Sequence, residues 1–216
     1  MIDSYELFTT ALLYFTSFFT LINPLGVMPV FMTMTAEISE KQRRRTALKA
    51  VFTAFITLML FAFAGQLLFK FFGISVNGFR MVGGIIFFIM GYELLQARIS
   101  RIDMDEEMVK KYVDDISITP LGIPIIAGPG AITNSIVLME DSHNFELKAV
   151  LILSIVVTLL ITWIVMLSSG RLLKIIGPTG NKIMMKLMGL IMMVIAVEFF
   201  FAGLKPIIVD IIKSVQ

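Results

Sequence analysis

The sequence predicts an all-α integral membrane protein: six transmembrane helices, arranged as two inverted-topology repeats of three helices, with helices 1 and 4 broken. Three observations predict this fold class. Hydrophobic residues make up 57% of the 216 residues, charged residues only 16%, and the mean hydropathy is +0.91. Apolar runs long enough to cross a bilayer recur along the chain. Proline and glycine interrupt two of these runs, at positions where lipid offers no hydrogen bonds.

A bilayer core about 30 Å thick requires about 20 apolar residues in a helix. On this basis the expected spans cover residues 7–36, 48–69, 74–97, 117–139, 147–169 and 183–204. A straight helix of the first run would be about 45 Å long, at about 1.5 Å per residue, so we expect it to bend at Asn23-Pro24. Asp3 and Glu6 replace the basic start of a cleavable signal peptide, so the first span is expected to stay.

The two breaks are Asn23 to Pro29 in the first span and Pro120 to Gly130 in the fourth. A helix broken at membrane depth exposes free N–H groups on one piece and free carbonyls on the other. These ends carry about half a positive and half a negative charge, which suits a zwitterion. The alternative for each break is a packing kink whose polar groups a neighbouring helix satisfies.

The breaks therefore predict a small zwitterionic substrate, held near the middle of the membrane. Backbone amides at a helix start bind carboxylates, and glycines let a ligand approach the backbone closely. The predicted substrate-binding residues are Asn23, Pro24, Gly26, Gly128, Pro129, Gly130, Thr133 and Asn134.

Internal similarity divides the chain into a first repeat, 1–97, a charged cytoplasmic linker, 98–116, and a second repeat, 117–216. The sequence Leu-Lys-Ala-Val at 48–51 recurs at 147–150, and residues 65–73 resemble 170–177. The third and sixth spans share glycines and a glutamate. Each half has an odd number of spans, so the second enters the membrane from the opposite side. Chance similarity between apolar helices is the alternative explanation.

Lysine and arginine are distributed unevenly between the two sides of the predicted topology. Thirteen of the 18 lie in the first, third and fifth connections, and five lie on the other side. The positive-inside rule then places both termini outside the cytoplasm.

The two breaks resemble paired motifs of a known family. Asn-Pro-Leu-Gly-x-x-Pro-x-Phe at 23–31 and Pro-Leu-Gly-Ile-Pro-Ile-Ile-Ala-Gly-Pro-Gly-Ala-Ile at 120–132 are similar to the signatures of the MarC family of bacterial and archaeal inner-membrane proteins, within the LysE-type transporter superfamily. Gly122 stands where alanine is more usual. The resemblance covers nearly the whole chain and implies a multi-pass protein of the cell membrane that transports small neutral amino acids such as glycine and alanine, coupled to an ion gradient.

The expected function is a secondary transporter working by alternating access. An ion channel, which would need a multimer to supply a ring of ligands, and an exporter of another small metabolite are the alternatives. An enzyme is not expected, because cysteine is absent and the single histidine, His143, has no catalytic partner. We expect no cofactor, metal or nucleic-acid partner, and leave a homo-oligomer open.

Glu198 is the candidate for coupling to a proton or sodium ion, since it is predicted to lie deeper in its span than Glu93. The alternative is a structural carboxylate that reaches the interface or pairs with a basic side chain.

Overall fold

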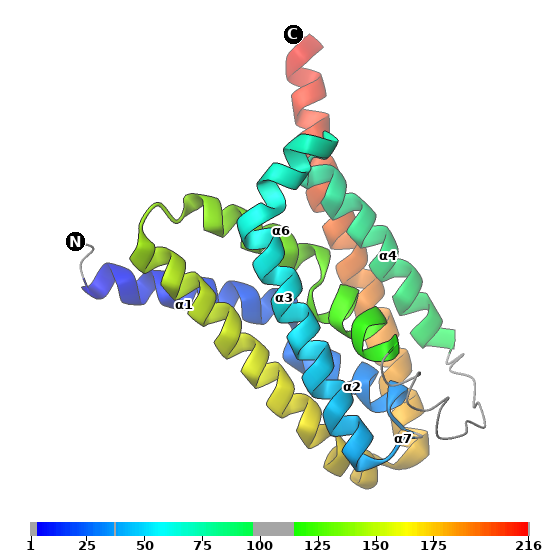
Figure 1. The fold of residues 1–216 in the computed structure, drawn as a ribbon. Helices are drawn as coiled ribbons and strands as arrows, with labels where there is room; N and C mark the ends of the chain where they lie inside the picture. The colour runs from blue at the N-terminus through cyan, green and yellow to red at the C-terminus, as the bar shows by residue number, and fades with distance from the viewer. Residues whose placement is uncertain (1–3, 37, 97–114, 216) are drawn as a thin grey trace.

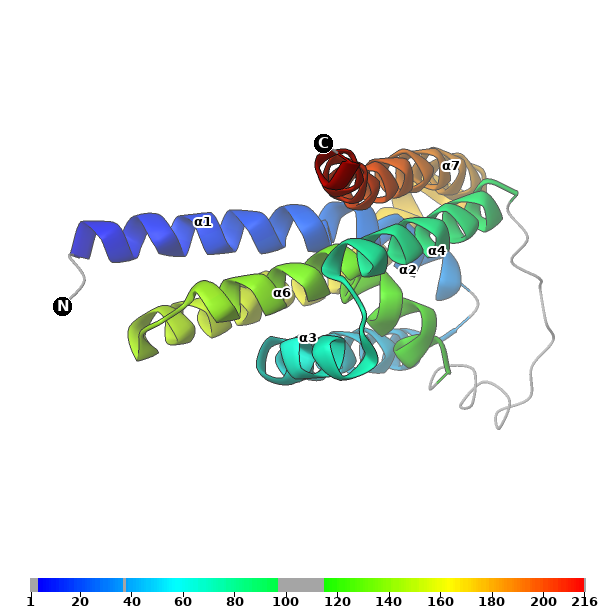
Figure 2. The same ribbon diagram turned by 90° about the horizontal axis from the view of Figure 1, so that it is seen from above.

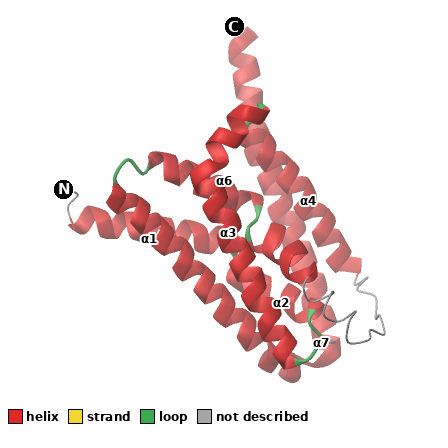
Figure 3. Ribbon diagram, viewed as in Figure 1, coloured by secondary structure: helices red, strands yellow, loops and turns green. Residues whose placement is uncertain are grey.

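The computed structural model describes residues 4–36, 38–96 and 115–215, and within these ranges all regular structure is helical (Figure 3). The elements are α1 (Ser4–Ile22), α2 (Pro24–Met34), α3 (Glu40–Phe72), α4 (Val76–Gln96), η1 (Ser117–Ile126), α6 (Pro129–Asp141) and α7 (Phe145–Val215), as Figure 1 shows. Apart from its last two residues, the charged linker predicted at 98–116 lies outside the described ranges.

Helix α7 consists of two helical arms that meet at Gly177. This residue has φ 70° and ψ 178°, a conformation that glycine adopts far more readily than other residues. In Figure 1 the first arm (residues 145–176) runs down the molecule, and the second arm (residues 178–215) returns and extends beyond the other helices. Each arm contains one stretch long and apolar enough to cross a membrane, Phe145–Ser169 and Gly189–Ser214.

The structure supports fewer membrane spans than the six expected. Two further helical stretches pass the same criteria of length and composition, Tyr5–Met34 and Glu40–Phe72. A fifth span results if η1 and α6, which meet at an angle of 61°, are taken together. Helix α4 is 21 residues long and is not among these spans. Among the described residues the number of candidate spans is therefore four or five.

Helix α3 contains the second expected span, residues 48–69, and extends beyond it at both ends. The helix begins at Glu40, because Ser39 and Gln42 form a reciprocal capping box. It ends at Phe72, and the cap residue Gly73, with a φ of 64°, closes the last turn. The first turns of α3 carry charged residues that a search for apolar runs excludes, although these residues are helical.

Small residues line the buried face of α3 and let other helices approach closely. They are Ala47, Ala50, Ala54, Ala62 and Gly65. Gly122 of η1, which stands where alanine is more usual, belongs to this packing. A Cβ at residue 122 would lie 2.9 Å from the Cβ of Thr53 on α3. The absence of a side chain at residue 122 therefore lets η1 pack closely on α3.

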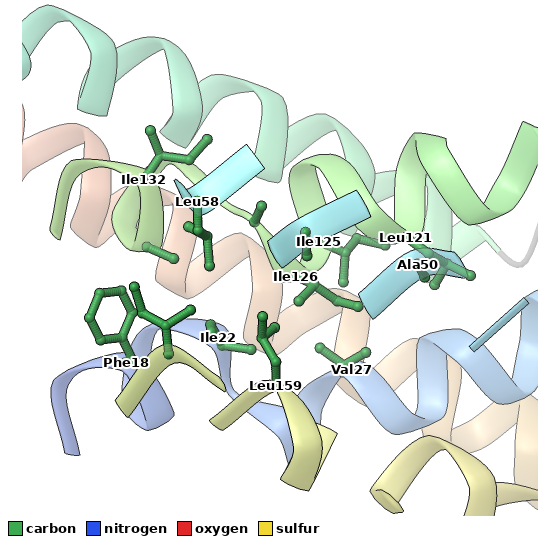
Figure 4. Close-up of a cluster of buried hydrophobic side chains, with 14 of the residues drawn as sticks. Phe18, Ile22, Val27, Ala50, Leu58, Leu121, Ile125, Ile126, Ile132 and Leu159 are labelled. Carbon is green, nitrogen blue, oxygen red and sulfur yellow. The ribbon is translucent and has the colours of Figure 1, made fainter. Parts of the chain in front are cut away.

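One apolar core joins α1, α2, α3, η1, α6 and the first arm of α7 (Figure 4). Phe18, Leu58, Leu121 and Ile126 are fully buried in it. Large apolar side chains also cover the outside of the molecule, including Phe63 and Leu67 on α3, Leu153 on the first arm of α7, and Val194 on the second arm. Extended apolar surface of this kind marks contact with a membrane or a partner, and it agrees with the composition.

Candidate functional site

The first break is made by Asn23, which separates α1 from α2. Its backbone is left-handed, with φ 49° and ψ 68°, a conformation that asparagine tolerates better than most residues. Its side-chain Oδ1 accepts a hydrogen bond from the backbone N of Gly26 at 3.1 Å. A Cβ on Gly26 would lie 2.5 Å from Asn23 Nδ2, so glycine at 26 leaves room for this cap. Pro24 is buried and occupies the first helical position of α2.

The second break is longer, because prolines distort the chain before it turns into α6. Thr119 and Ile123 have non-helical φ and ψ inside η1, and each precedes a proline, as expected from the clash of a proline ring with the preceding residue. Gly128 is extended, with φ −75° and ψ 166°, and Pro129 begins α6.

The two helix starts differ in the backbone donors that they leave free. In α2, the amides of Gly26 and Val27 both donate to the backbone O of Asn23, at 2.9 and 3.0 Å. In α6, the first such bond is from Ile132 to the backbone O of Gly128, at 2.9 Å. The amides of Gly130 and Ala131 precede it and have no intrahelical acceptor. The start of α6 therefore leaves two consecutive backbone donors for an anion, Gly130 and Ala131, whereas the start of α2 leaves the amide of Leu25. Binding by the amides after Pro24 stays a prediction.

The broken ends of the first and fourth expected spans lie against each other. A Cβ on Gly130 would lie 3.0 Å from Leu21 Cδ2, which belongs to the last turn of α1. The C-terminal end of α1 carries partial negative charge and the N-terminal end of α6 partial positive charge. The tertiary structure thus brings opposite helix ends together, as a zwitterion requires.

A partly enclosed cavity of about 410 Å³ opens beside this junction. Asn23 and Gly26 line it from the first break, Ile125 from η1, and Phe87 from α4. The second arm of α7 adds Met192 and Phe199. Such a volume lies in the range of about 300–1,000 Å³ found for small-molecule sites, and a mostly apolar wall with a few polar groups is usual there.

The predicted residues of the second break lie next to this cavity but do not line it. A Cβ on Gly128 would be 2.8 Å from Phe87 Cζ, and one on Gly130 would be 2.4 Å from Phe199 Cζ. Pro129 packs on α4, where a Cβ on Gly83 would be 2.0 Å from Pro129 Cγ. The two phenylalanines therefore stand between the cavity and the start of α6. Sequence reasoning missed both, because an apolar ring in an apolar helix carries no distinguishing signal.

Thr133 and Asn134 lie one helical turn further along α6. Thr133 is 1% exposed. Its Oγ1 and the Nδ2 of Asn134 are buried without a hydrogen-bond partner. Buried polar atoms are nearly always paired in proteins, so unpaired ones indicate a missing ligand, water or functional strain.

Glu198 lies on the exposed surface of the second arm of α7 and does not line the cavity. No ion pair of Glu198 exists within the described part of the chain. Its role in coupling stays a prediction.

A helical membrane protein with a cavity between broken helices is the class of molecule that these features define. The chain belongs to the MarC family of integral membrane proteins, whose sequence pattern matches residues 8–208. It is 36% identical over 200 residues to a UPF0056 membrane protein of Pyrococcus horikoshii, covering 93% of this chain and 96% of that one. It is also 36% identical over 194 residues to the UPF0056 membrane protein YvbG of Bacillus subtilis, covering 88% and 92%.

A UPF0056 membrane protein of Methanocaldococcus jannaschii is 35% identical over 195 residues, which cover 90% of this chain and 95% of the relative. No solved structure matches the chain. The family assignment confirms the resemblance of the two break motifs, and it makes the chain a multi-pass integral membrane protein. The wider LysE-type superfamily stays an expectation.

Proposed function

We propose that this chain is a secondary transporter of small neutral amino acids such as glycine and alanine, not an enzyme, and that it works by alternating access coupled to a proton or sodium gradient. The observation that carries the proposal is the contact between Leu21 at the end of α1 and Gly130 at the start of α6. Free carbonyls suit an ammonium group, and the amides of Gly130 and Ala131 suit a carboxylate. Asn23 borders the cavity that leads to this junction.

The spacing of the helices supports two repeats of similar length. Pro129, at which α6 begins, lies 105 residues after Pro24, at which α2 begins. Phe145, the start of α7, lies 105 residues after Glu40, the start of α3. The repeated Leu-Lys-Ala-Val segments are 99 residues apart and not 105, so they do not occupy equivalent helix positions. Helix starts are therefore better support for the duplication than this sequence match.

The packing of α4 on the second arm of α7 supports the inverted arrangement (Figure 2). A Cβ on Gly84 would lie 2.6 Å from the backbone O of Ala196, and a Cβ on Gly189 would lie 2.6 Å from that of Gly91. The residues 105 positions after Gly84 and Gly91 are Gly189 and Ala196. The contact of Gly84 with Ala196 therefore corresponds to the contact of Gly189 with Gly91 in the other repeat. Self-complementary contacts are typical of a two-fold axis, which is the symmetry that alternating access uses. On this proposal α4 also crosses the cell membrane, as the third expected span, which brings the number of spans to six, with both termini outside the cytoplasm.

The test is uptake of labelled glycine into proteoliposomes that contain equal amounts of wild type, Asn23→Ala or Gly130→Leu. The leucine side chain would occupy the space of Phe199 and Leu21 and cover the free amides, so we expect uptake by Gly130→Leu to fall to background. Asn23→Ala should slow uptake at least about tenfold, because it removes a cap and a polar wall of the cavity.

Asn144→Ala is the matched control, since Asn144 is an exposed asparagine outside the cavity. Its uptake should equal that of wild type. A wild type that neither takes up glycine nor gains thermal stability from any of the small neutral amino acids would contradict the proposed substrate, because a ligand of the folded form raises its melting temperature.

A further inference from the structure

We infer that Phe87 and Phe199 form an aromatic gate that separates the cavity from a buried polar subsite at Gly130, Ala131, Thr133 and Asn134. This inference rests on the proposed transport function, and it identifies which residues control access to the carboxylate end of the site.

The two rings pack side by side at the start of α6. Their centroids are 6.0 Å apart and their planes are inclined by 39°. Phe87 is 7% exposed, although both rings border the cavity. On the other side, Phe87 Cζ and Phe199 Cζ cover Gly128 and Gly130, closely enough that a Cβ on either glycine would clash. The glycines therefore let the rings seal the first turn of α6.

The polar subsite lies beyond the rings, on the side away from the cavity. Helix α1 passes α6 in the opposite direction, because Leu21 contacts Gly130 while Tyr14 bonds Ser142 at 3.0 Å. The cavity contacts α1 at residues 19–22. Moving along α6 from Gly130 toward Ser142 therefore leads away from the cavity, and Thr133 and Asn134 lie in that direction.

Thr133 differs from the other buried threonines of the described helices. Thr33, Thr57, Thr158 and Thr162 each donate to the carbonyl four residues earlier, at 2.8 to 3.0 Å. The Thr133 hydroxyl makes no such bond although it is buried. Buried polar groups are nearly always paired, so on this inference the hydroxyl is available to a ligand that enters the subsite.

The groups beyond the gate match one end of an amino acid. Asn134 Nδ2 donates and the Thr133 hydroxyl can donate. The free amides of Gly130 and Ala131 donate as well. Asn134 lies four residues after Gly130 and so shares its helix face. A carboxylate accepts from several donors at once, whereas a cation would find few acceptors here. The rings exclude water while the subsite is empty and must rotate to admit a ligand.

The chain contains no cysteine, so a cysteine at Thr133 reports on the gate directly. We would measure the rate at which 2-sulfonatoethyl methanethiosulfonate, which carries an anionic head group, modifies Thr133→Cys in the purified full-length protein. The rate should be slow with both rings present. Phe199→Ala or Phe87→Ala should raise it at least about tenfold, since the barrier to local opening is lowered. Phe199→Leu should give an intermediate rate.

Two matched controls separate gating from general loosening. Ser135→Cys is the control reporter, because Ser135 is fully buried on the opposite face of the same helix. Phe61→Ala is the control truncation, since Phe61 and Phe79 form a pair of similar geometry, 6.2 Å apart and inclined by 37°, outside the cavity. Neither control should show the acceleration.

Equal acceleration at Ser135→Cys, or no acceleration in either ring variant that remains monodisperse, would overturn the gate. If an alanine variant does not fold, the leucine variant of the same ring, Phe87→Leu or Phe199→Leu, decides the question by the same criterion. A ring-dependent rate in a protein that does not transport glycine would leave the gate standing and reject the proposed cargo. Glycine uptake together with a ring-independent modification rate would support the proposed cargo and reject the gate.

Discussion

The backbone and the side chain of Asn23 both contribute to the break between α1 and α2. The left-handed backbone ends α1, and the side chain caps α2 through Gly26. Alanine keeps neither advantage, because it loses the cap and strains at positive φ. Glycine loses the cap but adopts the same backbone freely.

The first prediction is an order of stability at residue 23: wild type above Asn23→Gly, and Asn23→Gly above Asn23→Ala. We expect the alanine variant to lose about 1–3 kcal/mol, from a cap and from left-handed strain, and the glycine variant only a few tenths. The measurement is the melting temperature in detergent. An alanine variant as stable as the glycine variant would contradict the left-handed conformation at this residue.

The packing of α4 on the second arm of α7 depends on glycine residues in both helices. Gly91 and Gly189 place the two backbones so close that each lacks room for a Cβ. In a membrane, where water does not drive apolar surfaces together, such close packing is a main source of helix association. The contact is therefore specific to small residues.

The second prediction compares a glycine in the interior of a helix with a glycine in the first turn of another. Gly189→Ala should destabilise the protein by about 1–3 kcal/mol, because overpacking outweighs the gain in helix propensity. Gly78→Ala should be neutral or stabilising by up to about 1 kcal/mol, since its Cβ would have one neighbour within 4 Å, the Ser75 hydroxyl oxygen at 3.1 Å, which accepts a hydrogen bond from the Gly78 amide. Melting temperatures of the two variants check this difference in sign. A shift in the same direction for both would argue against the backbone contact.

The direction of the chain in the membrane is a property of the whole molecule. The third prediction places Lys41, at the start of α3, inside the cell and His143, in the turn before α7, outside it. In intact cells a membrane-impermeant thiol reagent should label His143→Cys and not Lys41→Cys. After lysis both should react, because both positions are exposed. The opposite pattern in intact cells would invert the topology.

Coupling also concerns the whole molecule, since a gradient acts across the membrane. The fourth prediction is that a proton or sodium gradient changes the rate of glycine uptake, and that Glu198→Gln weakens this effect. Glu146→Gln is the control, because Glu146 is an exposed carboxylate in the first turn of α7, outside the cavity. Uptake by Glu198→Gln with an unchanged response to both gradients would remove this residue from the coupling mechanism.

The break at Asn23-Pro24 and the break ending at Pro129 were predictable, because proline and glycine act on the local backbone. Both breaks are present in the structure. The start of α3 at Glu40 was not found from apolar runs, because helices continue into water under the control of caps. The sixth expected span, 183–204, begins and ends earlier than the apolar stretch Gly189–Ser214 of the second arm of α7.

The sequence by itself determined the class of the protein, its family and the two places where helices break, since composition and local backbone chemistry decide these features. The tertiary structure decided which ends meet and what lies between them. It placed Leu21 against Gly130, left the Thr133 hydroxyl unpaired, and set Phe87 beside Phe199. These relations join residues far apart in the chain, so they depend on how the helices pack and not on any local pattern.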